Sequence, residues 1–152
     1  FPHNQIQILD YNRVLKSNLR IDKVFNIISR NFIIKKINNN SKNLKKGNME
    51  MYVHHQWYSL KQIKNNNKLD VTTLHEKIIS KIKADKIDFI SGINSSSTLK
   101  KLVNSKKFNI AFKLCPTNIS SVMRIADKKR FMPPKSTWFH PKPLDGLICS
   151  EL

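Results

Sequence analysis

The chain is short of several residue types, and each shortage excludes a class of protein. Its two cysteines, without a Cys-x-x-Cys pair, cannot build a disulfide framework or supply the four ligands of a structural zinc. Apolar runs such as Phe32-Ile33-Ile34 are too short for a transmembrane helix, and no signal peptide is recognised. Because the sequence starts at Phe1 rather than Met, we expect a fragment, a processed chain or the product of a split gene.

Acidic residues are also few. Lys and Arg number 28 against 10 Asp and Glu, a net charge of +18, and this balance is typical of proteins that bind nucleic acids or anionic surfaces. However, 23 of the cations are Lys, beside 17 Asn and 19 Ile but only 3 Ala and 3 Gly. This composition is typical of an AT-rich bacterial genome, in which Lys accumulates at exposed positions. The Lys residues are scattered along the chain, so a nucleic-acid partner is not favoured, and no membrane partner is predicted.

Length and periodicity indicate the fold. The 152 residues, 39% apolar, suffice for one domain with a real core. Helical and strand patterns alternate, which predicts an α/β fold, with α+β left open: a single layered domain with a mixed sheet and about four helices. Strands are expected at residues 5–9, 32–37, 49–54, 56–60, 87–91, 108–115 and 146–150. Helices are expected to be capped by Asp22, Asp70, Ser96 or Ser97, and Thr117. The helices after Asp70 and Thr117 each have an apolar stripe at helical spacing, formed by Val71, Leu74, Ile78 and Ile82 in the first and by Ile119, Val122, Met123 and Ala126 in the second.

Two long connections stand out. Residues 38–48 are polar with one apolar side chain, Leu44, so we expect a mobile loop. Residues 128–143 are rich in proline, and we expect this loop to pack on the sheet with Trp138 or Phe139 buried. Cys115 and Cys149 lie in strand-like contexts that favour plain buried thiols, which fits a cytoplasmic location.

One stretch of this second loop matches a family signature. Phe131-Met132-Pro133-Pro134-Lys135-Ser136-Thr137-Trp138-Phe139-His140-Pro141-Lys142, followed by Gly146-Leu147, resembles the C-terminal signature of the family catalogued as domain of unknown function 1015 (DUF1015). Ile8-Leu9-Asp10-Tyr11-Asn12-Arg13 resembles the segment that opens the C-terminal half of that family. Trp57-Tyr58, Leu69-Asp70-Val71 and Leu74-His75 follow in the family's order. The resemblance spans nearly the whole chain.

The resemblance also implies that an N-terminal half is missing. In full-length members that half has an Asp-Gly-His-His-Arg motif, similar to motifs of the ParB-like and sulfiredoxin-like superfamily, which includes free-serine kinases. His54-His55 is not this motif, because Val53 and Gln56 flank it. The resemblance therefore assigns no catalytic residue, cofactor or metal to this chain. It places any nucleotide in the full-length protein, and it makes the missing half the expected partner.

The sequence also suggests a ligand site. The Lys135 turn follows two prolines, which cannot supply the backbone N–H groups of a phosphate-binding glycine loop. A stiff turn of ammonium and hydroxyl groups instead suits a small anionic ligand, and Arg13, at a strand end, offers a bidentate donor. A purely structural turn, and a surface salt bridge of Arg13, remain open. We expect Lys135 to face a cleft that Arg13 also reaches. The candidate residues are Arg13, Asn12, Lys135, Ser136, Thr137, His140 and Lys142.

Three functional hypotheses follow. The first is an accessory domain of a small-molecule enzyme, inactive alone, with phosphoryl transfer as the reaction by analogy with the free-serine kinases. The second is a ParB-like nucleic-acid-associated or regulatory module. The third is the remnant of a decaying gene. His75, in a helical pattern beside Leu74, is interpreted as a boundary histidine bonded to backbone rather than as a ligand.

Overall fold

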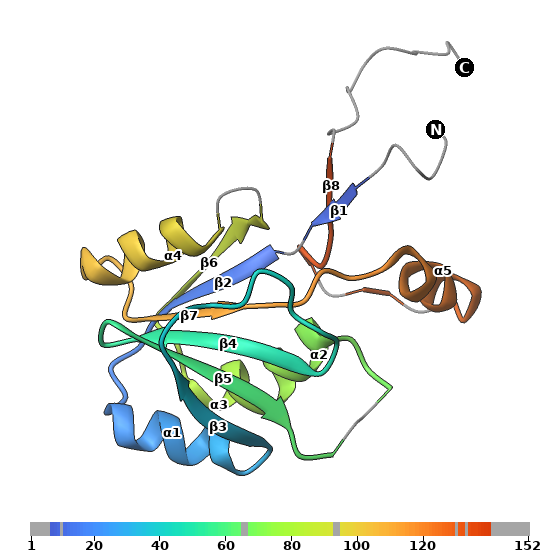
Figure 1. The fold of residues 1–152 in the computed structure, drawn as a ribbon. Helices are drawn as coiled ribbons and strands as arrows, with labels where there is room; N and C mark the ends of the chain where they lie inside the picture. The colour runs from blue at the N-terminus through green and yellow to red at the C-terminus, as the bar shows by residue number, and fades with distance from the viewer. Residues whose placement is uncertain are drawn as a thin grey trace.

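The computed structural model of the chain describes residues 7–9, 11–64, 67–92, 95–129, 131–132 and 134–140. They form a mixed α and β domain whose main sheet has six strands in the order β3-β5-β4-β7-β2-β6. The strands are β2 (Tyr11–Lys16), β3 (Phe32–Ile37), β4 (Asn48–Val53), β5 (Gln56–Gln62), β6 (Lys86–Ser91) and β7 (Ile110–Lys113). The predicted fold class is confirmed, and Figure 1 shows the sheet with its helices.

The direction of the strands differs from the expected mixed sheet. All of the described pairings are antiparallel. Alternation of helix and strand favours parallel pairing only where a helix connects neighbouring strands, and here the helix after β2 leads to β3, at the far edge of the sheet. β4 and β5 instead form a hairpin through His54 and His55, whose φ angles of 47° and 61° suit a two-residue turn.

The helices agree in number with the prediction. Three of them are α1 (Ile21–Ser29), α4 (Ser95–Asn104) and α5 (Ile119–Asp127). The fourth is continuous from Asp70 to Ile82 and consists of α2 (Asp70–Leu74), the π-helical turn η1 (His75–Ile79) and α3 (Ser80–Ile82); we call it the rod. The stripe predicted for this rod is buried: Val71 is 5% exposed, and Leu74, Ile78 and Ile82 are fully buried. The stripe continues through η1 because Leu74, Ile78 and Ile82 are four residues apart, which suits the wider π-helical turn.

The helix caps follow the sequence less closely. Arg20 and Leu69, rather than Asp22 and Asp70, occupy the N-cap positions of α1 and α2, and neither makes a side-chain capping bond. Asn118 instead of Thr117 caps α5, where its side chain accepts a hydrogen bond from Ser121 N at 2.8 Å. Asp22 and Asp70 lie two residues and one residue after these N-caps, still in the first turn, where an acidic side chain interacts favourably with the positive end of the helix dipole.

Helices pack on both faces of the sheet. On one face the rod and α1 enclose a core that includes Leu15, Ile28, Phe32, Met51 and Phe112. On the other face α4 contributes Leu99 and Val103, which pack against Val14, Tyr52 and Trp57. Successive residues of a strand point to opposite faces. Arg13 and Leu15 therefore face the rod, whereas Asn12 and Val14 face α4.

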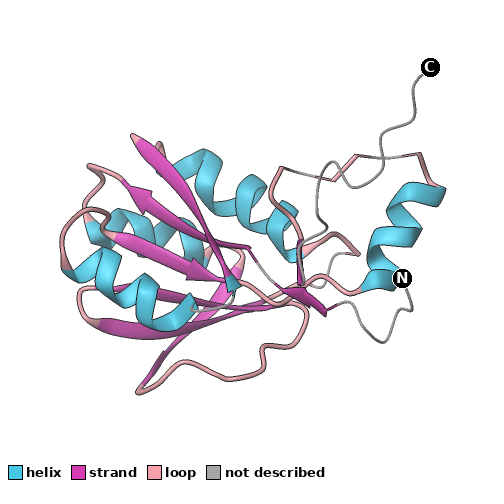
Figure 2. Cartoon of the chain, turned by 90° about the horizontal axis from the view of Figure 1, so that it is seen from above, coloured by secondary structure: helices cyan, strands magenta, loops and turns pink. Residues whose placement is uncertain are grey.

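α5 breaks a sequence prediction. The stripe of Ile119, Val122, Met123 and Ala126 was expected to face the core, but Ile119 is 49% and Met123 56% exposed. Ser121 is buried instead. α5 lies beyond the end of the sheet, where it appears at the right in Figure 2. A helical period predicts that a helix has an apolar face but does not determine which surface covers that face.

The proline-rich loop contains a short strand. β8 (Trp138–His140) pairs with β1 (Gln7–Leu9) in a separate two-stranded sheet, with Leu9 opposite Trp138. Trp138 packs edge-on against Tyr11, with ring centroids 5.5 Å apart. Trp138 and Phe139 are each half-buried, so neither is fully buried as expected. The strand predicted at residues 146–150, with Cys149, lies outside the described residues.

Candidate functional site

Arg13 contacts the Lys135 turn, but it does so through main-chain carbonyls of the turn. Arg13 is 3% exposed on β2. Its Nη1 donates to Tyr11 O at 2.6 Å, and its Nη2 donates to Lys135 O at 2.9 Å and to Pro134 O at 3.4 Å. Lys135 has a left-handed φ of 55°. The guanidinium therefore holds the turn against the sheet, which is a structural role for a residue predicted to bind ligand.

The charge of Arg13 is held in a poorly hydrated place. Its guanidinium lies over the ring of Phe89, 4.5 Å from the centroid. Burial lowers the pKa of Arg13 to about 10, and the Tyr11 interaction opposes that shift. At neutral pH the side chain therefore remains a cation, stabilised by carbonyl oxygens and an aromatic face.

Arg13 forms part of the wall of a cleft of about 330 Å³. The cleft lies between the edge strand β6 and the π-helical turn, and its lining residues are Arg13, Val71, His75, Ile79, Ile87, Phe89 and Pro134. Ile87 and Phe89 are each 38% exposed, so the apolar walls are accessible. A cation among apolar walls suits a ligand with an anionic group beside a flat or apolar part. His75, interpreted from the sequence as a boundary histidine rather than a ligand, lines this cleft.

The other predicted site residues do not gather in the cleft. Lys135 is exposed, with its Nζ 5.6 Å from the centroid of the Tyr11 ring. Ser136 is buried and its carbonyl accepts a hydrogen bond from Thr117 at 3.4 Å, while Thr137 is half-buried. His140 is exposed at the end of β8. Lys142 lies outside the described residues, and Asn12 lies on the opposite face of the sheet from Arg13.

A second polar group lies at the centre of the sheet, on the face that α4 covers. Glu50 on β4 lies opposite Lys113 on the neighbouring strand β7. Asn12 on β2 lies beside them, and its Oδ1 accepts a hydrogen bond from Leu114 N at 3.0 Å. We call Glu50, Lys113 and Asn12 the polar row. They are 1%, 8% and 0% exposed. Sequence reasoning missed Glu50 and Lys113, although a charged residue inside an apolar strand is an available signal.

Residues 38–47 cover the polar row. Ser41 N donates to Glu50 Oε1 at 2.7 Å, and Lys113 Nζ donates to Ser41 O at 2.5 Å. Asn12 Nδ2 and Glu50 Oε2 are buried with no hydrogen-bond partner within the described part of the chain. A buried donor and a buried acceptor without partners are costly, so they indicate a place where polar groups of another molecule would be favourable.

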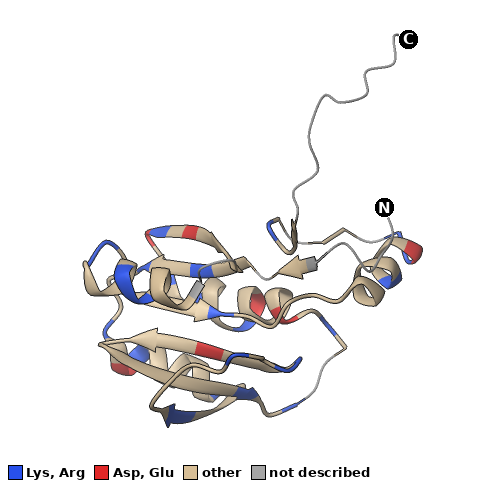
Figure 3. Cartoon of the chain, turned by 45° about the horizontal axis from the view of Figure 1, so that its top comes forward, with Lys and Arg blue, Asp and Glu red and all other residues tan. Residues whose placement is uncertain are grey.

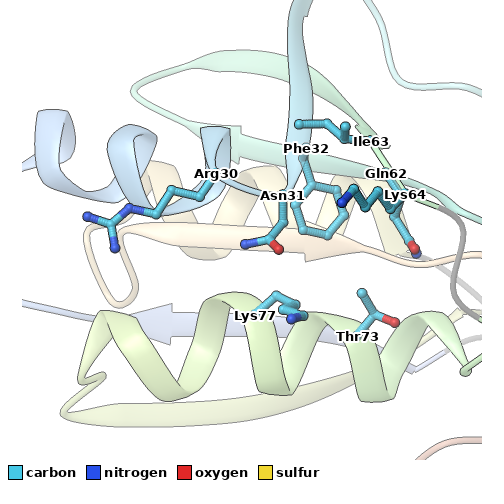
Figure 4. Close-up of a pocket in the computed structure, with 8 residues that line it drawn as sticks. All are labelled: Arg30, Asn31, Phe32, Gln62, Ile63, Lys64, Thr73 and Lys77. Atoms are coloured by element: carbon cyan, nitrogen blue, oxygen red, sulfur yellow. The ribbon is translucent and has the colours of Figure 1, made fainter.

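A third feature is a cationic pocket of about 310 Å³ on another side of the rod, where Thr73 and Lys77 line it. Lys64 and Asn31 reach it from the strand side, and Lys77 and Thr73 from the helix below (Figure 4). Arg30 adds a third cation. Ion pairs in the described chain are Arg20–Asp22 and Lys68–Glu76, so no acid neutralises these three cations. The pocket can hold a small anion.

Other kinds of site are not seen in the described residues. No group of three or more His, Cys, Asp and Glu side chains there could hold a metal ion, and no helix there is long and apolar enough to cross a membrane. Cys115 is half-buried rather than fully buried, and its thiol donates to Leu44 O at 3.1 Å.

Solved structures share this fold. A conserved hypothetical protein from Pyrococcus furiosus is 12% identical, with a TM-score of 0.58, over 91% of this chain and 57% of that chain. A free serine kinase in complex with AMP is 11% identical, also with a TM-score of 0.58, over 91% of this chain and 55% of the kinase. Identities this low show a common fold alone. The chain spans little more than half the length of these proteins.

Sequence comparison gives the family. A comparison with curated proteins gave no match. The sequence profile of the family described as "Protein of unknown function (DUF1015)" matches residues 1–88. That range includes Asn12-Arg13, Trp57-Tyr58 and Leu74-His75, but it ends before the proline-rich signature. Because the match covers more than half of the 152 residues, the chain belongs to the DUF1015 family.

Proposed function

We propose that this chain is the C-terminal, accessory domain of a small-molecule enzyme and contributes the Arg13 cleft to a site that an N-terminal half completes. The observation that carries the proposal is the cleft itself, in which a buried guanidinium meets accessible apolar walls. The greater length of the proteins that share the fold supports the need for a second half. A cytoplasmic location is part of the proposal.

Phosphoryl transfer is the reaction we propose. The guanidinium of Arg13 has five N–H donors, more than its three carbonyl contacts use, so it can also suit phosphate oxygens. The Phe89 and Ile87 walls suit a nucleobase or another flat group. A protein that shares the fold is named a free serine kinase and was solved with AMP, which supports this choice by analogy. Besides Arg13, the cleft lining holds one titratable side chain, His75. The chain would therefore bind and orient a phosphate-bearing substrate while the absent half supplies the reacting groups.

Binding and turnover can be tested on the chain itself. We expect AMP to give saturable NMR shifts of Phe89, Ile87 and His75, and we expect no phosphorylation of L-serine by ATP or ADP. Phe89→Ala should weaken AMP binding about tenfold, since the ring is an apolar wall. Ile33→Ala, on the opposite edge strand and 59% exposed, is the matched control. Turnover at ordinary enzyme rates, or shifts absent from the cleft, would overturn the proposal.

The cationic pocket favours a second candidate, a polyanion-binding module. Arg30, Lys64 and Lys77 are three cations without an acidic partner among the described residues. Against it, Lys and Arg are spread over helices, strands and loops in Figure 3 rather than along one stripe. A nucleic-acid module would show a steep loss of single-stranded DNA affinity with salt, reduced by Lys77→Gln. We expect a shallow dependence.

A further inference from the structure

The polar row is not explained by the fold or by the proposed Arg13 cleft. Composition can place Lys at exposed positions, but Lys113 is 8% exposed in the centre of the sheet, between Glu50 and Asn12. Burying two charges in an apolar sheet rarely stabilises a protein compared with apolar residues of similar volume. Asn12 Nδ2 and Glu50 Oε2 of the row also have no hydrogen-bond partner among the residues that the structure describes. The row therefore calls for a role other than packing.

The contacts of Ser41 indicate what the row recognises. Glu50 accepts a hydrogen bond from the backbone nitrogen of Ser41, and Lys113 donates one to the backbone carbonyl oxygen of Ser41. The N–Cα–C–O unit of Ser41 therefore lies between an acidic and a basic side chain. A free α-amino acid has the same unit, with an ammonium in place of the amide and a carboxylate in place of the carbonyl. From this geometry we propose that the polar row binds a free α-amino acid with a small side chain, whose place Ser41 occupies in the unliganded chain.

A free amino acid would complete the row better than the peptide does. Its ammonium has three donors, enough for Glu50 Oε1 and for the unpartnered Oε2. Its carboxylate has two oxygens, one for Lys113 Nζ and one for the unpartnered Asn12 Nδ2. Each contact would also gain full charge on the ligand side, and charge-assisted hydrogen bonds are roughly twice as strong as neutral ones. The ligand would thus satisfy all the polar atoms that the loop leaves unpaired.

Access to the row requires residues 38–47 to lift. The side chains of this loop are exposed except for the half-buried Asn40 and Leu44, and Ser41 itself is exposed. Hydrogen bonds to the rest of the domain hold the loop at Asn40, Ser41, Leu44 and Gly47, including Asn40 Nδ2 to Ser96 Oγ at 2.8 Å and Gly47 N to Asp70 at 3.0 Å. The exposed side chains between these points bury little apolar surface, which corresponds to low local stability. The closed loop competes with the ligand. The apparent affinity for the ligand therefore decreases as the fraction of molecules with a closed loop increases.

This inference deepens the proposed function by giving the enzyme an amino acid as its second substrate, but its test needs no turnover. We expect L-serine added to the ¹⁵N-labelled chain to give saturable shifts of the Ser41, Glu50 and Leu114 amides. Ethanolamine, which lacks the carboxylate, and glycolate, which lacks the ammonium, should each bind at least about tenfold more weakly. Equal binding of glycolate and L-serine would overturn the proposal, because a simple anion site would then suffice.

Variants separate the row from the loop. Glu50→Gln and Lys113→Gln should each weaken L-serine binding about tenfold or more, whereas Lys42→Gln, exposed on the same loop, should leave it within about twofold. Ser41→Pro removes the competing N–H and Asn40→Ala removes the contact with Ser96, so each should tighten binding. These two variants keep the test decisive if a row variant fails to fold.

Two results would overturn the amino-acid site. One is the absence of saturable L-serine binding in both the wild-type chain and Ser41→Pro. The other is unchanged binding in Glu50→Gln and Lys113→Gln. Neither result affects the Arg13 cleft, because AMP is followed there through Phe89, Ile87 and His75, on the opposite face of the sheet.

Discussion

At the scale of single residues, Arg13 shows how a residue chosen for ligand chemistry can be needed for structure. Its guanidinium is the partner of three backbone carbonyls, those of Tyr11, Pro134 and Lys135. The charge of Lys135, in contrast, lies in solvent beside the Tyr11 ring. The two residues belong to one turn, yet removing each side chain should have a different effect.

We predict that Arg13→Ala lowers the free energy of unfolding by about 2–4 kcal/mol, because it removes a buried side chain together with its three part-buried hydrogen bonds to carbonyls. Lys135→Ala should change the free energy of unfolding by no more than about 0.5 kcal/mol. Lysine and alanine have a similar cost at the left-handed φ of this position, and the lysine side chain is exposed. Urea unfolding followed by circular dichroism measures both. Equal decreases in the free energy of unfolding in the two variants would contradict the structural role of Arg13, which is to hold the Lys135 turn against the sheet.

Asp70 gives a prediction about pH. Burial raises its pKa above the ordinary value of 3.8, although the hydrogen bond from Gly47 and the charge of Lys46 oppose the shift. A raised pKa means that the folded chain binds the proton more tightly than the unfolded chain does. The resulting stabilisation is complete below 3.8 and is lost as the pH rises through the folded-state pKa.

Asp70→Asn should therefore flatten this part of the stability profile and unfold at equal or higher urea concentration than wild type at pH 7. The exposed Asp22→Asn is the control, since its side chain is 71% accessible. Thermal and urea unfolding between pH 3 and 8 measure the effect. A markedly less stable Asp70→Asn at pH 7 would mean that the carboxylate charge itself holds Gly47 in place.

At the scale of elements, local periodicity predicted most of the helices and strands but not which elements lie side by side. It missed β2, so Arg13, expected at a strand end, lies within a strand of the main sheet instead. Phe32–Ile37 follows from its β-branched residues and the Val71–Ile82 stripe from the helical spacing of its apolar residues, and both signals are local. The exposure of the Met123 face of α5 depends on which element packs against that face, and the strand directions depend on which strands are neighbours. Neither can be determined from a short stretch of sequence. Glu50 and Lys113 were missed for the same reason, since strand register alone brings them together.

The loop over residues 38–47 remains a predicted mobile segment, and its contacts make that prediction sharper. Ser41 and Gly47 donate their amides to Glu50 and Asp70, so their hydrogen exchange should be slower than that of Lys42, Asn43 and Lys46 by about tenfold or more. Glu50→Ala should abolish the protection at Ser41 and leave Gly47 unchanged. Uniformly slow exchange along the loop would show that it is rigid.

At the scale of the whole molecule, charge and size are the two dominant features. The chain has a net charge of +18 and spans 55–57% of the proteins that share its fold. The excess of positive charge makes the chain repel itself, and ion pairs do little to offset this repulsion. The two pairs found among the described residues, Arg20–Asp22 and Lys68–Glu76, are both exposed, with side-chain accessibilities of 81% and 71% and of 52% and 41%. Exposed pairs contribute about 0–1 kcal/mol, so self-repulsion should govern how salt affects stability.

We therefore predict that salt stabilises the chain. Raising NaCl from about 20 to about 200 mM shortens the screening length from roughly 20 Å to roughly 7 Å, which weakens repulsion between distant Lys residues more than it weakens contacts. The melting temperature should rise by a few degrees, equivalent to about 1 kcal/mol. Sodium sulfate at equal ionic strength separates screening from binding: an additional rise that Lys77→Gln removes would place an anion in the cationic pocket. A fall in melting temperature with salt would show that attractive pairs outweigh repulsion.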